Sequence, residues 1–486
     1  MKRLPLILLA ALLALAAVLA IRTASFGSRQ IKAEPAHPFA IDSEALARRL
    51  SAAIQYRTVS NEEPIQAGGG EFRRFHKFLA ASFPRLHAQL TKETINARSL
   101  LYSWKGKDDK LKPILLAAHM DVVPVETRSE GAWSQPPFSG RIADGYIWGR
   151  GAMDDKAGVL GILEAVEGLL GEGFQPRRTI YLAFGHDEES GGANGAAKIA
   201  ERLRSTGVEL EYVLDEGLNI VEGVIPGIAA PAALVGIAEK GYLSLELSVQ
   251  TAGGHSSIPP TDNAIAILSR ALQRVEAAPF PARLAGPTRQ MLEFLGPEMA
   301  WANRVALANL WLFDPLIRNE LAGSPLTNAL IRTTLAPTLF NAGINESVLP
   351  TRASAVVNLR ILPGETTTRA TEHVQKAIAD PRVKITPLPV RMEPSAVADP
   401  AARSFAVIQR TIRQVAPDAI VAPALLVAGT DSRHYAGLTK NIYRFLPITL
   451  RPDDAKRYHG IDERISIQDY ERCVRFYAQL IRNSNR

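Results

Sequence analysis

The chain has 486 residues but a single cysteine, Cys473. One cysteine excludes an intramolecular disulfide and any metal site built from several thiolates. The sequence also lacks a run of lysine and arginine with interleaved aromatic residues, so we expect no nucleic acid partner. Its formal net charge of +7 is compatible with an anionic small-molecule substrate or with a membrane surface.

The N-terminus carries an uninterrupted apolar run. Lys2 and Arg3 precede the segment 4–21, which contains no charged residue. Its 18 residues fit either a signal peptide or a short membrane anchor, and the run continues past a possible cleavage motif at 14–16. We expect residues 1–30 to direct export. The rest of the chain would then be periplasmic, extracellular or anchored to a membrane, whether or not the segment is cleaved.

Four short apolar runs, each with the length of a buried strand, are followed by acidic or histidine residues. They are 114–118 with His119 and Asp121, 146–148 with Asp154, 178–184 with Glu188 and Glu189, and 212–214 with Asp215. Loops at the carboxyl ends of parallel strands present side chains at one edge of a sheet. An apolar helix at 157–170 is suited to cover such a sheet. The pattern predicts an α/β fold with a mixed, mostly parallel sheet and helices on both faces.

A second domain is expected from the length of the chain and from a change of pattern at Lys240. Residues 242–250 alternate apolar and polar, as in a sheet with one solvated face. A β-α-β-β-α-β order, typical of a ferredoxin-like α+β domain, follows in the segments 242–250, 262–275, 331–340, 352–361, 366–379 and 382–390. We predict that residues 240–390 form a lid or dimerisation domain inserted between two parts of a catalytic domain, 40–239 and 391–486.

Residues 280–330 are too apolar for a solvated linker within this inserted domain. The large side chains are Phe294, Trp301, Leu310, Trp311 and Phe313. They could wall a groove for an apolar acyl chain, or they could form the inserted domain's own core or a subunit contact.

Imidazole and carboxylate groups indicate a metal site. The candidate ligands are His119, Asp154, Glu188, Glu189, Asp215 and His459. Oxygen-rich sets with one imidazole per ion suit zinc, manganese or cobalt, and two neighbouring ions need a bridging carboxylate. An isolated acid on a loop is usually only solvated. Acids at four successive strand ends favour an enzyme over a binding domain with structural acids.

The chain resembles the zinc-dependent carboxypeptidase and aminoacylase metallopeptidases, which use two co-catalytic ions. The family blocks are Ala118–Pro124, Gly149–Lys156, Asp187–Gly192 and Gly253–Ser256. Gly429–Tyr435, Ile442–Phe445 and His459–Gly460 are similar to the branch that contains carboxypeptidase S and the N-fatty-acyl-amino-acid hydrolase/synthases. The likeness covers nearly the whole chain after residue 40.

The resemblance implies a ligand set for two zinc ions. Asp154 would bridge them. His119 and Asp215 would complete one site, while Glu189 and His459 would complete the other. Mn²⁺ or Co²⁺ could replace zinc.

The resemblance also implies two catalytic carboxylates. Asp121 would hold the free N–H of the His119 imidazole, as carboxylates behind a metal ligand do. Glu188 would be the general base toward the attacking water and then the acid toward the leaving amine. For His186 in the same loop we expect a local hydrogen-bonding role.

Substrate contacts are implied on both domains. His255 resembles a family histidine that stabilises the oxyanion, often from a neighbouring subunit, which suggests a homodimer. Asn345 and Arg360 match positions that touch substrate. Thr430 and Arg433 match a loop that holds a free carboxylate, for which arginine is suited by its bidentate geometry.

The expected reaction is cleavage of the amide bond of N-acyl amino acids or short peptides with a free C-terminal carboxylate. It could run toward hydrolysis or toward synthesis of N-fatty-acyl amino acids. The alternatives are a plain dipeptidase or carboxypeptidase, and an N-deacetylase of polar intermediates.

Overall fold

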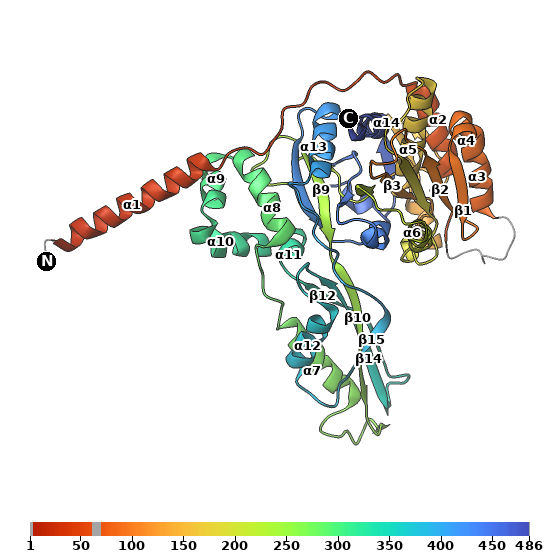
Figure 1. Ribbon diagram of the computed structural model, residues 1–486. Coiled ribbons are helices and arrows are strands. Elements are labelled where there is room, and N and C mark those ends of the chain that lie inside the picture. The colour runs from red at the N-terminus through yellow and green to blue at the C-terminus, as the bar shows by residue number, and fades with distance from the viewer. Residues whose placement is uncertain (1–2, 61–69, 486) are drawn as a thin grey trace.

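The computed structural model describes residues 3–60 and 70–485; Lys2, part of the predicted export signal, lies outside them. A large catalytic domain is built on a ten-stranded sheet, and a four-stranded domain projects from it (Figure 1). The helix α1, Arg3–Ser25, extends away from the body. The predicted fold class, a mixed and largely parallel α/β sheet with a second α+β domain, is confirmed.

The central sheet has the strand order β1-β2-β6-β3-β7-β17-β9-β8-β18, with β16 paired to β9. The bounds are β1 Thr91–Ile95, β2 Ser99–Trp104, β3 Ile114–His119, β6 Ile180–Gly185, β7 Tyr212–Asp215, β8 Ile220–Val221, β9 Ala232–Glu239, β16 Ile420–Leu426, β17 Ile442–Arg444 and β18 Thr449–Leu450. Strands β6, β3, β7 and β17 are parallel neighbours. Their carboxyl ends therefore meet at one edge of the sheet.

Helices cover both faces of this sheet. One face packs against α2 Ser43–Ile54, α3 Glu71–Ser82, α4 Pro84–Gln89, α5 Lys156–Gly171, α13 Arg403–Val415 and α14 Ile467–Ser484. The other face is covered by α6 Ala196–Ser205 and the 3-10 helix η4 Asp431–Gly437. Strand β3 is buried on both faces: Leu116 belongs to the α5 core and Leu115 to the α6 core. A continuous apolar sequence is what such a strand requires.

A three-stranded sheet lies beside the main one and holds two of the loops that form the site. It has the order β19-β5-β4, with β4 Ile142–Ala143, β5 Tyr146–Trp148 and β19 Arg464–Ser466. Because β19 pairs with β5, the turn after Trp148 lies next to the chain before Arg464.

The inserted domain has the predicted β-α-β-β-α-β order. Its antiparallel sheet has the order β12-β14-β10-β15. The bounds are β10 Gly241–Gln250, α7 Ala264–Glu276, β12 Thr334–Ala342, β14 Arg352–Ile361, α12 Thr367–Ile378 and β15 Lys384–Met392. The two helices pack on apolar residues of the sheet. The ten residues of β10 span about 30 Å, so the small ladder of β11 Gly254–His255 with β13 Val348–Leu349 lies far from the junction at Gly241.

The segment between α7 and β12 packs on the catalytic domain. It consists of α8 Gly286–Leu295, α9 Trp301–Ala308, α10 Leu310–Ala322 and α11 Pro325–Ile331. Phe294 is buried against Phe405 of α13, with ring centroids 5.9 Å apart. Trp301 and Trp311 remain exposed near the base of α1. The alternative that placed the large side chains of this segment in the inserted domain's core is wrong. Apolar character shows that a segment packs, but not against which core.

Residues 26–42 connect α1 to α2 along the catalytic domain in extended form. The Gln30 side chain accepts from the backbone N–H of Val421 at 2.8 Å and donates to its carbonyl at 2.9 Å. The carbonyl of Arg29 accepts from Gln409 at 3.0 Å, and the carbonyl of Glu34 accepts from Gln414 at 3.1 Å. This connecting segment is therefore bound to the domain, and Gln30 occupies the free edge of β16.

We expect Gln30→Ala to destabilise the catalytic domain, because it leaves both backbone groups of Val421 without their partner. Two hydrogen bonds at about 1 kcal/mol each predict a loss of about 2 kcal/mol and a melting temperature lower by about 2 to 4 °C. Differential scanning calorimetry measures this. Gln273→Ala, on the exposed surface of α7, is the matched control. Equal melting temperatures for the two variants would show that Gln30 contributes nothing.

Candidate metal centre and active site

Side chains from four parts of the chain gather at the carboxyl edge of the central sheet. His119 ends β3, and Asp154 lies on the turn between β5 and α5. Glu189 lies on the 3-10 turn η2, Glu188–Ser190, after β6. His459 lies on the loop before β19. Ligand atoms of His119, Asp154 and Glu189 all lie within 4.8 Å of one another.

The Asp154 carboxylate lies between two imidazoles. Its Oδ1 is 2.9 Å from Nε2 of His119, and its Oδ2 is 3.1 Å from Nε2 of His459. Nε2 of His459 is also 3.2 Å from Oε2 of Glu189. Each carboxylate oxygen of Asp154 thus faces a different histidine, which is the arrangement required of a bridging ligand.

These distances fit metal coordination. Ligand atoms of a tetrahedral zinc with bonds of about 2.0 Å are about 3.3 Å apart, close to the separations found here. Nδ1 of His119 lies 3.0 Å from the Asp121 carbonyl, an acceptor, so Nδ1 carries the proton in the neutral imidazole. The other nitrogen, Nε2, then turns a lone pair toward the Asp154 carboxylate. Two acceptors in contact need a proton or a cation between them. Buried Oε1 of Glu189 and Oδ2 of Asp215 have no partner among the described residues, which also fits a cation.

Burial of so many carboxylates shifts their titration. Desolvation raises the pKa of Asp215 to about 6, and burial with nearby Asp431 and Glu189 raises the pKa of Glu188 well above its usual value. Asp154 differs, because hydrogen bonds from both histidines overcome its burial and lower its pKa. The hydrogen bonds that His459 donates to Asp154 and to Glu189 raise the pKa of His459 to about 10.

Asp121 supports the turn that carries both glutamates. Its Oδ1 accepts from the backbone N–H of Glu188 at 3.2 Å, and its Oδ2 accepts from that of Glu189 at 3.1 Å. Its carboxylate lies 3.4 Å from Nδ1 of His119, whereas its own carbonyl lies at 3.0 Å. The predicted contact with the imidazole is therefore made mainly by the Asp121 backbone. The carboxylate orients Glu188 and Glu189.

A buried ion pair joins the Asp154 turn to the His459 loop. Glu463 accepts from Nη1 of Arg150 at 2.6 Å and from the backbone N–H groups of Met153 and Asp154 at 2.8 and 3.2 Å. Nη2 of Arg150 donates to the carbonyls of His459 and Gly460 at 3.1 and 3.0 Å. The Arg150–Glu463 pair thus fixes the candidate ligands Asp154 and His459 relative to each other, although they are 305 residues apart in sequence.

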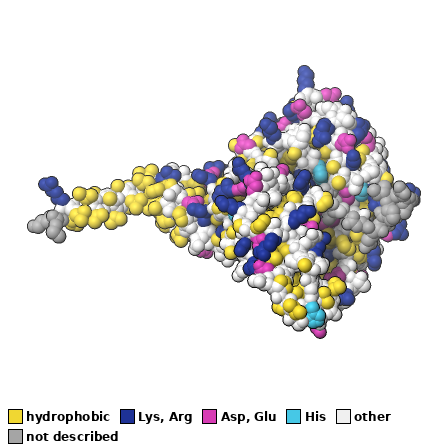
Figure 2. Space-filling view, turned by 90° about the horizontal axis from the view of Figure 1, so that it is seen from below, with side chains coloured by type: hydrophobic (Ala, Val, Ile, Leu, Met, Phe, Trp, Pro, Cys, Tyr) yellow, Lys and Arg dark blue, Asp and Glu magenta, His cyan; other side chains and the backbone are white. Residues whose placement is uncertain are grey.

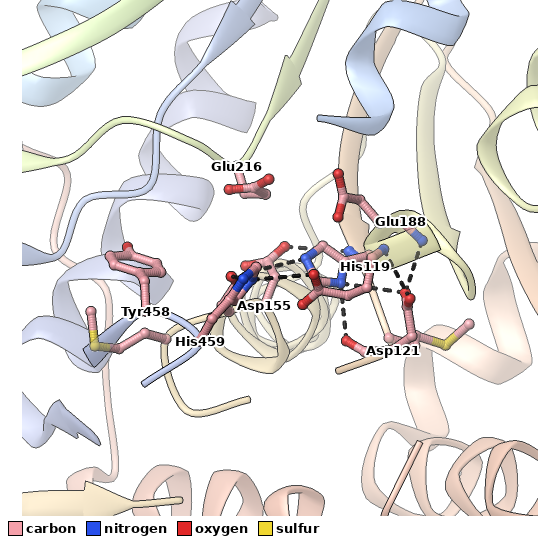
Figure 3. A network of polar contacts seen from close by, with 12 residues as sticks. His119, Asp121, Asp155, Glu188, Glu216, Tyr458 and His459 are labelled. Atoms are coloured by element: carbon pink, nitrogen blue, oxygen red, sulfur yellow. Dashed lines mark hydrogen bonds and ion pairs between the residues drawn. The ribbon is translucent and has the colours of Figure 1, made fainter. Parts of the chain in front are cut away.

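Two adjacent acids follow β7, and both come close to His119. The predicted ligand Asp215 is buried, and its Oδ1 accepts from the Glu216 N–H at 3.0 Å. Figure 3 shows the Glu216 carboxylate on the same side of His119 and His459 as Glu188. Burial, followed by the charges of Asp154 and Asp215, raises the pKa of Glu216 well above its usual value. Glu216 is therefore a second candidate for the ligand position beside His119.

A basic pair lies beside this cluster. Nη2 of Arg433 donates to the carbonyl of Gly191, directly after η2, at 3.0 Å. Arg360, on β14 of the inserted domain, is close enough that the positive charge of Arg433 adds to burial in lowering its pKa. The Thr430 hydroxyl is buried in contact with Glu239 and Ser432. The charge of Arg433 thus acts on Arg360 of the inserted domain, while Thr430 supports the loop.

His255 and Asn345 lie at the far end of the inserted domain. The backbone N–H of Ser256 donates to the carbonyl of Ser347, which holds the two loops together. His255 is exposed, and its Nδ1 contacts the Ser257 hydroxyl at 2.7 Å. The structure does not bring either residue to the metal ligands of its own chain. A contribution from a second subunit, as the resemblance implies for His255, is compatible with this position.

Sequence reasoning missed several residues of the site. Each stands next to a predicted one: Glu216 after Asp215, Asp431 after Thr430, and Arg150 and Glu463 within a few residues of a ligand. The acid pair Asp215-Glu216 was the available signal for Glu216. No local pattern reveals that Glu463 reaches Asp154. For His186 we expected a local hydrogen bond, but its Nδ1 contacts the Ser99 hydroxyl, 87 residues away in sequence, at 2.7 Å.

Comparisons of sequence identify relatives of this chain. The model of "Peptidase family M20/M25/M40" matches residues 115–483. The chain is 44% identical to probable carboxypeptidase S-like 2 of Dictyostelium discoideum, over 96% of this chain and 92% of that protein. It is 38% identical to the human N-fatty-acyl-amino acid synthase/hydrolase PM20D1, over 91% of this chain and 88% of that protein.

Solved structures share the fold. The M20 family metallo-carboxypeptidase Sso-CP2 from Sulfolobus solfataricus aligns with a TM-score of 0.65 at 17% identity, covering 92% of this chain and all of that one. Human carnosine dipeptidase 1 aligns with a TM-score of 0.63 at 14% identity, covering 91% of this chain and 96% of that one. With the cluster around Asp154, these matches lead to one conclusion. The chain belongs to peptidase family M20/M25/M40 and is an enzyme of this generally metal-dependent group of hydrolases.

Proposed function

We propose that this enzyme uses two zinc ions to cleave the amide bond of N-acyl amino acids that carry a free carboxylate. The observation that carries the proposal is the Asp154 carboxylate, which lies between His119 and His459. In this assignment Asp154 would be shared by both ions, Glu189 would complete the His459 site, and Asp215 or Glu216 would complete the His119 site. Mn²⁺ or Co²⁺ could take the place of zinc.

When bound, the ions would lower the pKa of a water and polarise the scissile carbonyl. Glu188 takes the proton from the attacking water through its carboxylate and later delivers it to the leaving amine nitrogen. Its backbone is fixed by Asp121, and its side chain points to the same space as that of Glu216 (Figure 3). Burial and the nearby charges of Asp431 and Glu189 raise the pKa of the Glu188 carboxyl well above its usual value, which suits a group that both accepts and donates a proton.

The substrate carboxylate is assigned to the basic pair. Arg433 and Arg360 repel each other, and an anion between them would relieve that repulsion. Arg433 is bonded to Gly191 and so lies beside the turn that holds Glu188. A carboxylate bound there would place the adjacent amide at the cluster. Thr430 supports this loop through Glu239, and Asn345 would contact substrate only after a rearrangement or from a second subunit.

A long acyl chain is favoured by the relatives that are named N-fatty-acyl-amino acid synthase/hydrolases. The predicted acyl groove of residues 280–330 has no support, because Phe294 is buried in the catalytic core. A dipeptidase or carboxypeptidase is therefore the second candidate, favoured by the name of the Dictyostelium relative. The same site could work toward hydrolysis or toward synthesis.

Export and assembly complete the proposal. Among the described residues, α1 is the one helix long and apolar enough to cross a membrane. It would anchor the enzyme or serve as its signal peptide, with the body outside the cytoplasm. The exposed His255 would reach the oxyanion of a neighbouring subunit in a homodimer.

We expect Glu188→Gln to retain both ions and to lower kcat by about 10²- to 10⁴-fold, because an amide cannot accept the proton. Asp154→Ala should instead lose metal, since both histidines lose their shared partner. Plasma-emission analysis and turnover of the two purified variants separate these outcomes. Turnover of Glu188→Gln near that of the wild type would exclude the base, and two ions in Asp154→Ala would exclude the bridge.

Removal of the ions should make stability depend strongly on pH. The pKa of Asp215 is raised to about 6, so the folded apo-protein binds a proton that the unfolded chain releases above about pH 4. The stabilising contribution of the protonated Asp215 therefore falls as pH rises from about 4 to about 6. The raised pKa of His459, about 10, acts in the same direction at higher pH. Because its pKa is lowered, Asp154 changes the stability of the folded protein only below about pH 4, where stability falls as pH falls.

The measurement is thermal unfolding of chelator-treated and zinc-loaded protein between about pH 5 and pH 9. The melting temperature gained from zinc should grow with pH, because the cations replace protons that are lost. A gain that does not change with pH would contradict a site held together by protons in the apo-protein.

The free carboxylate should be required for binding. Replacing it by an amide, or introducing Arg433→Met, removes a charge-assisted contact of about 1.5 to 3 kcal/mol and should raise KM about 10- to 100-fold. Arg360→Met should act in the same direction. Arg352→Met, at the exposed end of β14, is the matched control. Steady-state kinetics with N-fatty-acyl amino acids, N-acetyl amino acids and dipeptides provide the test. Preference for dipeptides would establish the second candidate.

A further inference from the structure

The helices α9 and α10 pack at the base of α1, and together they are the part of the body nearest to it (Figure 1). The side-chain amide of Asn309, at the corner between α9 and α10, donates to the Thr23 hydroxyl at 3.3 Å and to the Leu19 carbonyl at 3.4 Å. Leu19 lies six residues before Ser25, so the corner reaches about 9 Å along α1 from its C-terminal end. If α1 is embedded in a bilayer, this corner lies at the bilayer surface.

The outer side of the corner is apolar. From Leu310 to Arg318 the exposed residues of α10 are Trp311, Leu312, Pro315 and Leu316, and none of them is charged. Exposed fractions are 56% for Trp311 and 62% for Leu316. Trp301 on α9 is 66% exposed. Large apolar side chains of this number are costly to leave in water and mark a contact surface.

A basic group lies next to this apolar corner, at the C-terminal end of α1. Arg22 donates to the Ala308 carbonyl at 3.4 Å and has no acidic partner among the residues that the structure describes. It lines a groove of about 520 Å³ with Trp311 and with Arg29 and Arg289, which both pair with Glu293. Asp314 lines the same groove, and Arg22 is the arginine there without an acidic partner among the described residues. Figure 2 shows basic side chains gathered where the apolar helix meets the body. Tryptophan beside arginine at the end of an apolar helix is the composition of a membrane interface.

We propose that α9 and α10 form a second membrane-contact surface, which lies on the lipid bilayer beside α1. The proposal rests on the insertion of α1 into a membrane, as proposed above, and is independent of the substrate. Trp301, Trp311, Leu312 and Leu316 enter the headgroup region, and Arg22 lies near the lipid phosphates. The bond from Asn309 to α1 and this contact fix the body to the bilayer at two places, so the body cannot swing freely on residues 26–42.

Tryptophan fluorescence of the full-length protein in phosphatidylcholine–phosphatidylglycerol vesicles tests this surface. Trp104, Trp133 and Trp148 are buried, so lipids brominated near the headgroup should quench only Trp301 and Trp311. Those are two of the five tryptophans, and quenching should reach at most about two fifths of the emission. It should disappear in the double variant Trp301→Phe, Trp311→Phe. Leu312→Ser, Leu316→Ser should weaken it, whereas Val390→Ser, an exposed position on β15, should leave it unchanged.

Absence of quenching in vesicles that carry the protein would overturn the proposal. So would quenching that persists in the double tryptophan variant. A patch that instead joins two copies of the chain would appear in light scattering as a dimer that Leu312→Ser, Leu316→Ser dissociates, without quenching by brominated lipid. Failure of α1 to insert is distinguishable, because the whole protein would then be missing from floated vesicles.

Discussion

The Asp154 carboxylate, held between His119 and His459, is the contact on which the rest of the site depends. The end of β3, the Asp154 turn and the distant His459 loop must converge to produce it. Parallel pairing of β6, β3 and β7 aligns their carboxyl ends, and the Arg150–Glu463 pair brings the His459 loop to the Asp154 turn. Burying this much negative charge is unfavourable unless protons or cations compensate it. The fold therefore favours a metal centre at this edge.

Roles in the site are divided between ligands and the groups that orient them. Asp121 holds the turn of Glu188 and Glu189 through two backbone N–H groups, and Glu463 does the same for the Asp154 turn. Such contacts fix ligand geometry before an ion arrives, which lowers the entropic cost of binding it. Arg433 of the catalytic domain and Arg360 of the inserted domain repel each other electrostatically. An anionic substrate at that pair would draw the inserted domain toward the catalytic one.

Much of this arrangement could be predicted from the sequence, because buried parallel strands and the polar residues after them are local patterns. The strand β3 with His119 and the inserted β-α-β-β-α-β order are examples. For residues 280–330 the sequence left three alternatives open, because an apolar segment fits any apolar surface, and none of them was the catalytic core that buries Phe294. The half-exposed edge strand β1 has no apolar alternation and gave no signal. Glu463 depends on a contact across 309 residues, which periodicity cannot reveal.

The central claim is that two ions share Asp154. Zinc K-edge X-ray absorption of the fully loaded enzyme tests it most directly. The account predicts nitrogen and oxygen ligands at about 2.0 Å, no sulfur, and a metal–metal scattering path at about 3.5 to 4 Å. Ligand shells without a second metal at that distance, in protein that binds two ions, would contradict it.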